Sequence, residues 1–173
     1  MLRDRVRPGV RVLLIGINPG IRTAAIGHHF AGHSNGFWKL LYQSGLVSEP
    51  IGTEDDVRLP EWGLGITNLI ARATPGIDTL RPEYVAGERV LRRKVRRWRP
   101  PIVAFVGVTL YRAVFRHTPR APLSKKRVVG IQPERFEGAA VLVLPNPSRR
   151  NANFSYEDMT RHGRSRVDDC WSS

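Results

Sequence analysis

Residues 10–20, VRVLLIGINPG, are the stretch that decides the fold. A short, largely apolar run, Val10–Ile15, passes directly into Gly16 and an Asn-Pro-Gly turn. Apolar side chains on successive residues, rather than on alternate ones, are typical of strands covered on both faces, as in a parallel sheet. The stretch therefore predicts a buried strand that ends in a polar loop.

Three other segments show the same pattern and predict further strands. Two of them are strongly apolar, Ile102–Val106 and Ala139–Leu144, and a weaker one covers Leu64–Ile66. Helical patterns separate these segments, and an alternation of strands with helices is typical of α/β domains. We therefore predict a three-layer α/β/α domain with a short central, mainly parallel sheet.

Two helices are predicted from the spacing of apolar residues. Phe37, Leu40 and Leu41 share one face of a helix that we expect to start near Ser34 or Asn35 and to stop at Gly45. The second helix is expected over residues 82–99, where apolar residues recur at i, i+4 and i+7. Its many arginine and lysine residues indicate either a solvated outer face or secondary contacts with phosphates.

Composition limits the class of protein. The chain has 173 residues, 41% of them hydrophobic, and a formal net charge of +13. We expect one folded domain over residues 1–160, followed by an atypical C-terminal tail over residues 161–173 that frays. No apolar run is long enough for a bilayer, and the first residues do not resemble a secretory signal. We therefore expect a cytoplasmic monomer that binds no membrane, and the charge favours a polyanionic partner.

Cysteine and histidine residues give no sign of a metal site. The single cysteine, Cys170, excludes an intramolecular disulfide framework, a zinc finger and a four-cysteine iron–sulfur cluster. His28, His29 and His33 are close in sequence, but no nearby cysteine or carboxylate completes a set of ligands. We therefore expect no metal and no other cofactor.

Polar loops follow the predicted strands. Residues 16–20 follow the first strand, Asn68 the weak one, Gly107 the third and residues 145–148, PNPS, the last. In open parallel α/β sheets, ligands bind outside the carboxyl ends of the strands. These loops are therefore expected to converge on one rim, although they are far apart in the sequence.

The first of these loops excludes two common motifs. GINPG, residues 16–20, has neither the glycine spacing of a dinucleotide fingerprint nor the Gly-Lys-Ser/Thr of a P-loop. Its polar side chain, Asn18, can orient a water molecule or hold an amide, but it cannot remove a proton. Phe30 lies among small and polar residues, where an aromatic ring is either a core residue or a platform for a planar base.

Several motifs together resemble one known family. GINPG is followed by Phe30, by Asn-x-Phe-Trp-Lys at residues 35–39, by GITN at 65–68, by RATPG at 72–76 and by LPNPS at 144–148. Their order and spacing resemble the mismatch-specific uracil/thymine-DNA glycosylases, the Mug/TDG family. The resemblance covers about residues 10–159 and implies a uracil-DNA glycosylase-like fold, with residues 1–160 as a single glycosylase domain.

The resemblance implies a role for each matched position in the first loops. Asn18 matches the catalytic asparagine, which positions the water that attacks the sugar carbon. Phe30 matches the aromatic residue that stacks on the extruded base, and Asn68 matches an asparagine that contacts the base edge. The remaining matches line the base site through main-chain groups or a hydroxyl: Ile17, Gly20 and Thr23.

The late loop matches the element that fills the gap in the duplex and contacts the opposite guanine. It comprises Asn146, Pro147, Ser148, Arg149, Arg150 and Asn151. Some family members have a glycine and an apolar wedge after the serine, where this chain has two arginines. A guanidinium group can still intercalate and adds a phosphate contact, but its base preference can differ. Two solvated loop arginines are the alternative interpretation.

The function implied is that of a DNA repair enzyme, a hydrolase acting on N-glycosyl bonds. It would flip uracil, and thymine if the methyl group is admitted, out of G:U or G:T mismatches in double-stranded DNA. No lysine lies in the matched loops to form a Schiff base, so hydrolysis without strand cleavage is expected. The alternatives are a glycosylase of the same fold acting on single-stranded uracil or hypoxanthine, a non-catalytic protein that binds DNA or abasic sites, and a small-nucleotide-binding protein.

Overall fold

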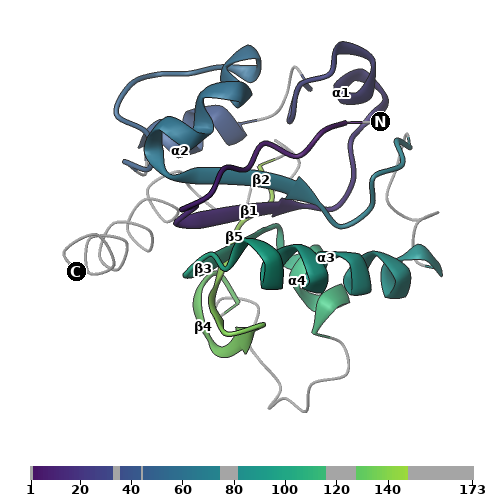
Figure 1. The fold of residues 1–173 in the computed structure, drawn as a ribbon. Coiled ribbons are helices and arrows are strands. Elements are labelled where there is room, and N and C mark those ends of the chain that lie inside the picture. Colours follow the sequence, from purple (N-terminus) through teal and green to yellow (C-terminus); the bar gives the residue numbers. More distant parts are fainter. Residues whose placement is uncertain (1, 33–35, 44, 75–81, 116–127, 148–173) are drawn as a thin grey trace.

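The protein has one five-stranded sheet in the order β2-β1-β3-β5-β4 (Figure 1). This computed structural model describes residues 2–32, 36–43, 45–74, 82–115 and 128–147. The strands are β1 (Val12–Gly16), β2 (Leu64–Asn68), β3 (Ile102–Val106), β4 (Gly130–Phe136) and β5 (Ala139–Leu144). Strands β2, β1, β3 and β5 run parallel to one another, and β4 pairs antiparallel with β5.

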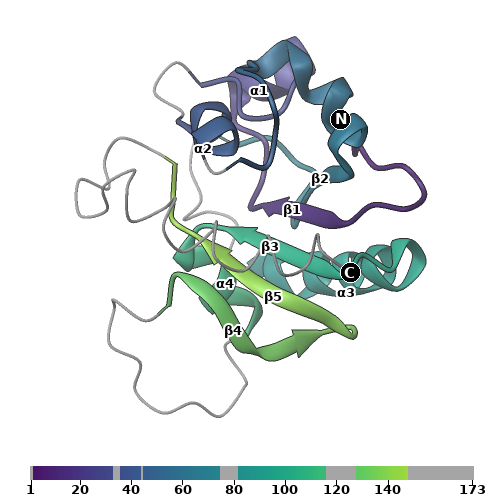
Figure 2. The same cartoon turned by 90° about the vertical axis from the view of Figure 1, so that its left-hand side faces the viewer.

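Helices cover both faces of the sheet. They are α1 (Ile21–Ile26), α2 (Phe37–Gln43), the 3₁₀ helix η1 (Thr53–Trp62), α3 (Tyr84–Trp98) and α4 (Val108–Val114). One apolar cluster joins a face of the sheet to α3 and α4, and a second joins the opposite face to α2 and η1. Figures 1 and 2 show α2 and α3 on opposite sides of the sheet. The predicted three-layer arrangement with a mainly parallel sheet is confirmed.

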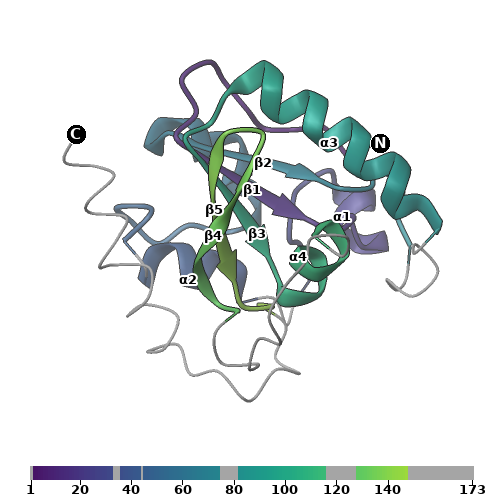
Figure 3. The ribbon, with the colours of Figure 1, turned by 90° about the horizontal axis from the view of Figure 1, so that it is seen from below.

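The predicted strands correspond to β1, β2, β3 and β5, and the weak prediction at Leu64–Ile66 extends to Asn68. Strand β4, which Figure 3 shows beside β5, was not predicted. Its sequence, GIQPERF, contains a proline and three charged or amide residues, and its ladder is irregular between Gln132 and Arg135. A partly exposed edge strand tolerates such residues, so its sequence resembles a loop.

The two predicted helices correspond to α2 and α3. Helix α3 ends at Trp98, where Arg99 adopts a left-handed φ of 49° ahead of Pro100-Pro101. The expected start of α2 near Ser34 or Asn35, and the expected C-terminal tail, lie outside the described residues. Helices α1, η1 and α4 were not predicted. The helices α1 and α4 have only six and seven residues, and η1 carries five charged residues and a proline. Within the described ranges, no helix is long and apolar enough to cross a membrane.

Parallel pairing places the carboxyl ends of the strands at one edge of the sheet. In the register of β1 and β2, Gly16 faces Asn68, and on the other side of β1 Ile15 faces Phe105 of β3. The loops that follow β1 and β2 therefore begin side by side, which brings Asn18 and Asn68 to the same edge.

Candidate active site

Gly16, Asn68 and Phe30 meet at the carboxyl edge of β1. A Cβ atom added to Gly16 would lie 2.6 Å from Asn68 Oδ1 and 3.4 Å from Phe30 Cζ. The first distance is too short for a real Cβ atom, so Asn68 would have to move, whereas the second is an ordinary van der Waals contact. The structure thus brings the predicted stacking residue and the predicted base-edge residue together over the backbone of the first strand.

Asn18 is half-buried, and its side chain is held by hydrogen bonds from its amide nitrogen. Its Nδ2 donates to Thr74 Oγ1 at 2.9 Å and to the Pro19 carbonyl at 3.1 Å. Both bonds use the amide nitrogen, so Oδ1 is directed by the same two contacts and accepts no hydrogen bond from another described residue. An amide oxygen fixed in this way is suited to accepting a hydrogen bond from water.

The backbone of the first loop is bound to the segment after β2. Leu69 N–H donates to the Gly16 carbonyl and Ile70 N–H to the Ile17 carbonyl, both at 2.8 Å. The ladder between β1 and β2 therefore continues beyond the strands, which fixes the position from which Asn18 extends. The Ile17 carbonyl is used in this pairing, whereas Gly20 is exposed and precedes α1.

Phe30 is held in a strained backbone conformation. Its φ is 52°, in the left-handed region that is uncommon for an aromatic residue. Its carbonyl accepts hydrogen bonds from Trp38 Nε1 at 3.3 Å and Thr53 Oγ1 at 3.2 Å. The ring is half-buried and stacks on Phe37, with centroids 3.9 Å apart and planes inclined by 19°. Phe37 thus supports one face of the ring from behind.

Thr23 supports the segment that carries Phe30. This threonine is buried, and its Oγ1 accepts a hydrogen bond from Ala31 N–H at 3.1 Å. Arg22 Nε donates to the Ala31 carbonyl at 3.0 Å, so α1 holds both polar groups of Ala31. The Thr23 hydroxyl therefore stabilises the turn at Ala31, in addition to its predicted role at the base site.

The late loop approaches the start of α2. The Pro147 carbonyl accepts a hydrogen bond from Gly36 N–H at 3.0 Å, immediately before Phe37. Asn146 is exposed, and a Cβ on Gly107 would lie 3.9 Å from its Cβ, so the loops after β3 and β5 are neighbours. The other predicted residues of this loop, Ser148, Arg149, Arg150 and Asn151, lie outside the described residues.

Sequence reasoning missed two polar contributors near the site. Thr74, which orients Asn18, belongs to the RATPG motif but was given no role. Asp56 lies 28 residues from His28, yet its carboxylate accepts a hydrogen bond from His28 Nδ1 at 2.9 Å. A carboxylate that is distant in the sequence therefore lies beside one of these histidines in the fold. In the described part of the chain, no three His, Cys, Asp or Glu residues group as metal ligands.

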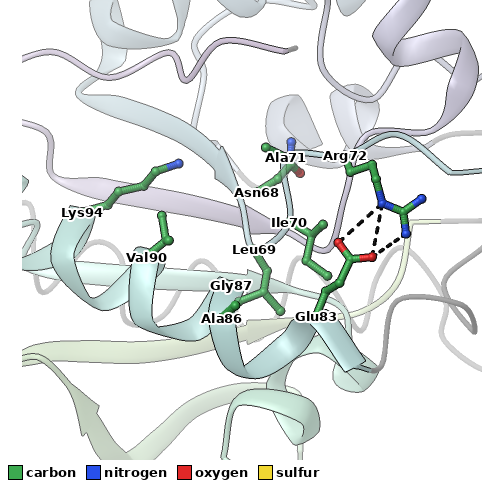
Figure 4. Close-up of a pocket in the computed structure, with 10 residues that line it drawn as sticks. All are labelled: Asn68, Leu69, Ile70, Ala71, Arg72, Glu83, Ala86, Gly87, Val90 and Lys94. Atoms are coloured by element: carbon green, nitrogen blue, oxygen red, sulfur yellow. Dashed lines mark hydrogen bonds and ion pairs between the residues drawn. The ribbon is translucent and has the colours of Figure 1, made fainter.

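A cavity of about 330 Å³ lies on the α3 side of Asn68 (Figure 4). Its walls come from the segment after β2 and from α3, and Figure 4 shows Arg72 and Glu83 paired at one end and Lys94 at the other. Neither Asn18 nor Phe30 lines it. This cavity therefore shares Asn68 with the cluster around Gly16, but it opens on the α3 side of that residue.

An aromatic platform and two amide side chains at the carboxyl edge of a parallel sheet define an α/β protein whose site suits a flat heterocycle. The chain belongs to the uracil DNA glycosylase superfamily, whose family model matches residues 4–170. Among curated proteins, it is 39% identical over 149 residues to a G/U mismatch-specific uracil DNA glycosylase from Schizosaccharomyces pombe. That match covers 84% of this chain and 46% of the relative, so the chain spans about half the length of the relative.

Proposed function

We propose that this protein is a DNA glycosylase that removes uracil mispaired with guanine from double-stranded DNA. The observation that carries the proposal is the joint placement of Phe30 and Asn68 over Gly16, on the loop edge where Thr74 orients Asn18. The superfamily and the name of the yeast relative support the choice of uracil and of the G/U mismatch.

The reaction begins with extrusion of the base, which costs a few kcal/mol and least for a mismatched pair. Phe30 stacks on the extruded uracil and Asn68 hydrogen-bonds its edge. Oδ1 of Asn18 accepts a hydrogen bond from a water molecule and directs its oxygen toward C1′ of the deoxyribose. The new C1′–O bond forms as the C1′–N1 bond breaks, and uracil leaves as an anion with the bonding electron pair. The proton that the water loses passes to this anion or to solvent, which leaves free uracil and an abasic site.

Asn18 orients this water without taking its proton. A positioned general base typically contributes about 10²–10⁴-fold to a rate, and an amide supplies none of that factor. The rate therefore depends on how readily the base leaves and how easily its pair opens, which favours mismatched uracil over paired bases. The loops of the site contain no lysine, so the proposed product is an abasic site in an uncut strand.

The proposal extends to the late loop and to the partner. Residues 146–151 would enter the duplex in place of the extruded base, with Arg149 or Arg150 filling the gap. Thymine opposite guanine would be a second substrate if the site admits its methyl group. The protein would act as a monomer on duplex DNA and would need only water as co-reactant.

The test is single-turnover excision from matched oligonucleotides that contain G·U, G·T, A·U or single-stranded uracil. We expect the highest rate with G·U. We expect Asn18→Ala to lower that rate about 100-fold, because the attacking water loses its orientation, while duplex binding and melting temperature are retained. Equal rates on single-stranded uracil and G·U would favour the alternative base preference. If wild type binds the G·U duplex but releases no uracil, the protein is a non-catalytic binder.

A further inference from the structure

Asp56 of η1 is a fully buried carboxylate, with 0% of its surface exposed. Burial of a charge is costly unless it is paired and hydrogen-bonded. Oδ2 accepts a hydrogen bond from His29 N–H at 2.9 Å, and Oδ1 accepts one from His28 Nδ1 at 2.9 Å. Arg5 Nε lies 3.4 Å from Oδ1. Asp56 thus holds the two residues that precede Phe30.

The turn before Phe30 is also fixed from its other side, by residues 3–5. The buried His29 ring donates from Nε2 to the Arg3 carbonyl at 3.0 Å. Arg5 NH2 donates to the Gly27 carbonyl at 3.2 Å. The segment over residues 3–5 and Asp56 therefore enclose the turn between them, and Arg5 contacts both.

Residues 3–5 are in turn bound to β2, which ends in Asn68. Arg5 and Ile66 exchange backbone hydrogen bonds of 3.0 and 2.9 Å, and Thr67 Oγ1 donates to Asp4 Oδ1 at 2.6 Å. Lys94 of α3 completes this contact, 2.7 Å from Asp4 Oδ2. One network therefore reaches the residue before Phe30 and the residue before Asn68.

Phe30 needs such support because its left-handed backbone conformation is unfavourable for an aromatic residue. Conformations of this kind cost about 1–3 kcal/mol and persist only where the surroundings enforce them. The bonds from Trp38 and Thr53 fix the carbonyl of Phe30, whereas Asp56 fixes the chain that enters it. Loss of the Asp56 carboxylate would remove the hydrogen bonds to His28 and His29 and leave those to the Phe30 carbonyl in place.

We propose that Asp56 is a positioning residue of the reaction, which sets the placement of the Phe30 ring relative to Asn68 through the turn at His28 and His29. This inference rests on the glycosylase function proposed above. Asp56 is fully buried, and it acts on the rate only through Phe30.

The kinetic test is a double-mutant cycle under single-turnover conditions on a G·U duplex. Asp56→Asn keeps the shape of the side chain but removes its charge and one acceptor. We expect its maximal rate to fall about 10- to 100-fold, the range that a displacement of about 1 Å costs, while the duplex Kd changes little. In a Phe30→Ala background the same substitution should change the rate less than about 2-fold, because coupled residues are not additive.

The matched control is Asp55→Asn, which removes an acidic charge from the same helix. Asp55 caps Gly52 N–H at 2.8 Å and does not touch the turn, so its substitution should leave the rate within about 2-fold. Equal losses from Asp56→Asn with and without Phe30 would overturn the proposal, since a general loss of stability acts in both backgrounds. If Asp56→Asn does not fold, His28→Gln removes a single contact with Asp56 and should show the same dependence on Phe30.

A second measurement places Phe30 without reference to activity. Aromatic ring signals of Phe30 in NMR spectra, shifted by the Phe37 ring below, should move in Asp56→Asn and stay unchanged in Asp55→Asn. Unmoved signals in Asp56→Asn would contradict the inference. A wild-type protein that releases no uracil would instead contradict the proposed function, while the NMR result would still decide whether Asp56 positions Phe30.

Discussion

At the scale of single residues, the site depends on contacts that leave no spare volume. Gly16 is buried in β1, where an added Cβ atom would lie 2.6 Å from Asn68 Oδ1 and 3.4 Å from Phe30 Cζ. Asn18 is oriented by one hydroxyl, that of Thr74. Because each side chain is placed by a neighbour from another loop, small substitutions outside the reacting groups are expected to affect the reaction.

Gly16→Ala is expected to lower uracil excision without unfolding the protein. The new methyl group would lie 2.6 Å from Asn68 Oδ1, which must therefore turn away from its present position. Overpacking of this kind costs about 1–3 kcal/mol, and we expect a loss of about 10-fold or more in the single-turnover rate. Gly52→Ala is the control, because a Cβ there has no atom within 4 Å. Equal rates for both variants would contradict this account of the site.

His29 predicts a dependence of stability on pH. Burial lowers the pKa of its imidazole below the ordinary value of 6.5, although the Arg3 carbonyl and two nearby aspartates oppose the shift. Below that pH the unfolded chain binds a proton that the folded protein resists, so the free energy of unfolding falls as the pH drops through this range.

The measurement is urea unfolding between about pH 8 and pH 5. His29→Gln retains a donor for the Arg3 carbonyl but does not titrate, so its free energy of unfolding should fall less steeply below about pH 6.5 than that of wild type. Above pH 7 residue 29 should contribute little to the pH dependence of the free energy of unfolding in either protein. Parallel curves below pH 6.5 would assign the effect to other groups.

At the scale of elements, the position of α3 is set by a close approach to the segment after β2. A Cβ on Gly87 would lie 2.6 Å from the Leu69 carbonyl oxygen and 3.2 Å from the Leu69 side chain. Leu69 directly follows Asn68, and its N–H bonds the Gly16 carbonyl. The helix therefore packs backbone to backbone against the loop that presents Asn68.

Gly87→Ala is expected to destabilise the protein, although alanine is the better helix former by about 1 kcal/mol. The methyl group would push α3 away from Leu69, at a net cost of about 1–3 kcal/mol in the free energy of unfolding. Urea denaturation measures this cost, with the exposed Val85→Ala on the same helix as control. If Gly87→Ala is more stable than wild type, the close packing of Gly87 against Leu69 does not require glycine at this position.

At the scale of the whole molecule, the chain has a net charge of +13, and only some of its basic side chains form ion pairs with acidic ones. On α3, Arg92 pairs with Glu88 and Glu137, and Lys94 pairs with Asp4. Arg89, Arg93 and Arg97 recur every four residues, are exposed, and form no ion pair with another described residue. They form a stripe about 12 Å long on the outer side of the helix, which runs away from the site toward the amino ends of the strands.

Replacement of this stripe should affect encounter with DNA and leave the chemical step unchanged. The triple variant Arg89→Gln, Arg93→Gln, Arg97→Gln has a net charge of 13 − 3 = +10. We expect a lower kcat/KM at low salt and a weaker dependence of kcat/KM on salt, with the saturating single-turnover rate unchanged. The control is Arg58→Gln, whose guanidinium is paired with Glu49 and Glu61 and should matter less per charge. A fall in the saturating rate would place the stripe at the reaction itself.

The sequence by itself determined the strands with continuous apolar runs, the helices α2 and α3, and the loops with Asn18, Phe30 and Asn68. These features are local, because apolar runs, helical spacing and turn residues each depend on only a few neighbouring positions in the sequence. The superfamily match confirmed the family that those motifs resemble. Strand β4 escaped prediction because an edge strand tolerates proline and charge.

Only the tertiary structure decided which partners hold the site residues. Thr74 orients Asn18 across 56 residues, and Asp56 reaches His29 across 27. Gly16 leaves room for Asn68, which arrives from another strand, and no pattern within residues 10–20 shows this contact. Such contacts depend on strand register and on the packing of loops from distant parts of the chain. The sequence motifs contain the residues that are proposed to contact the base, whereas the residues that hold them in place are defined only once the chain has folded.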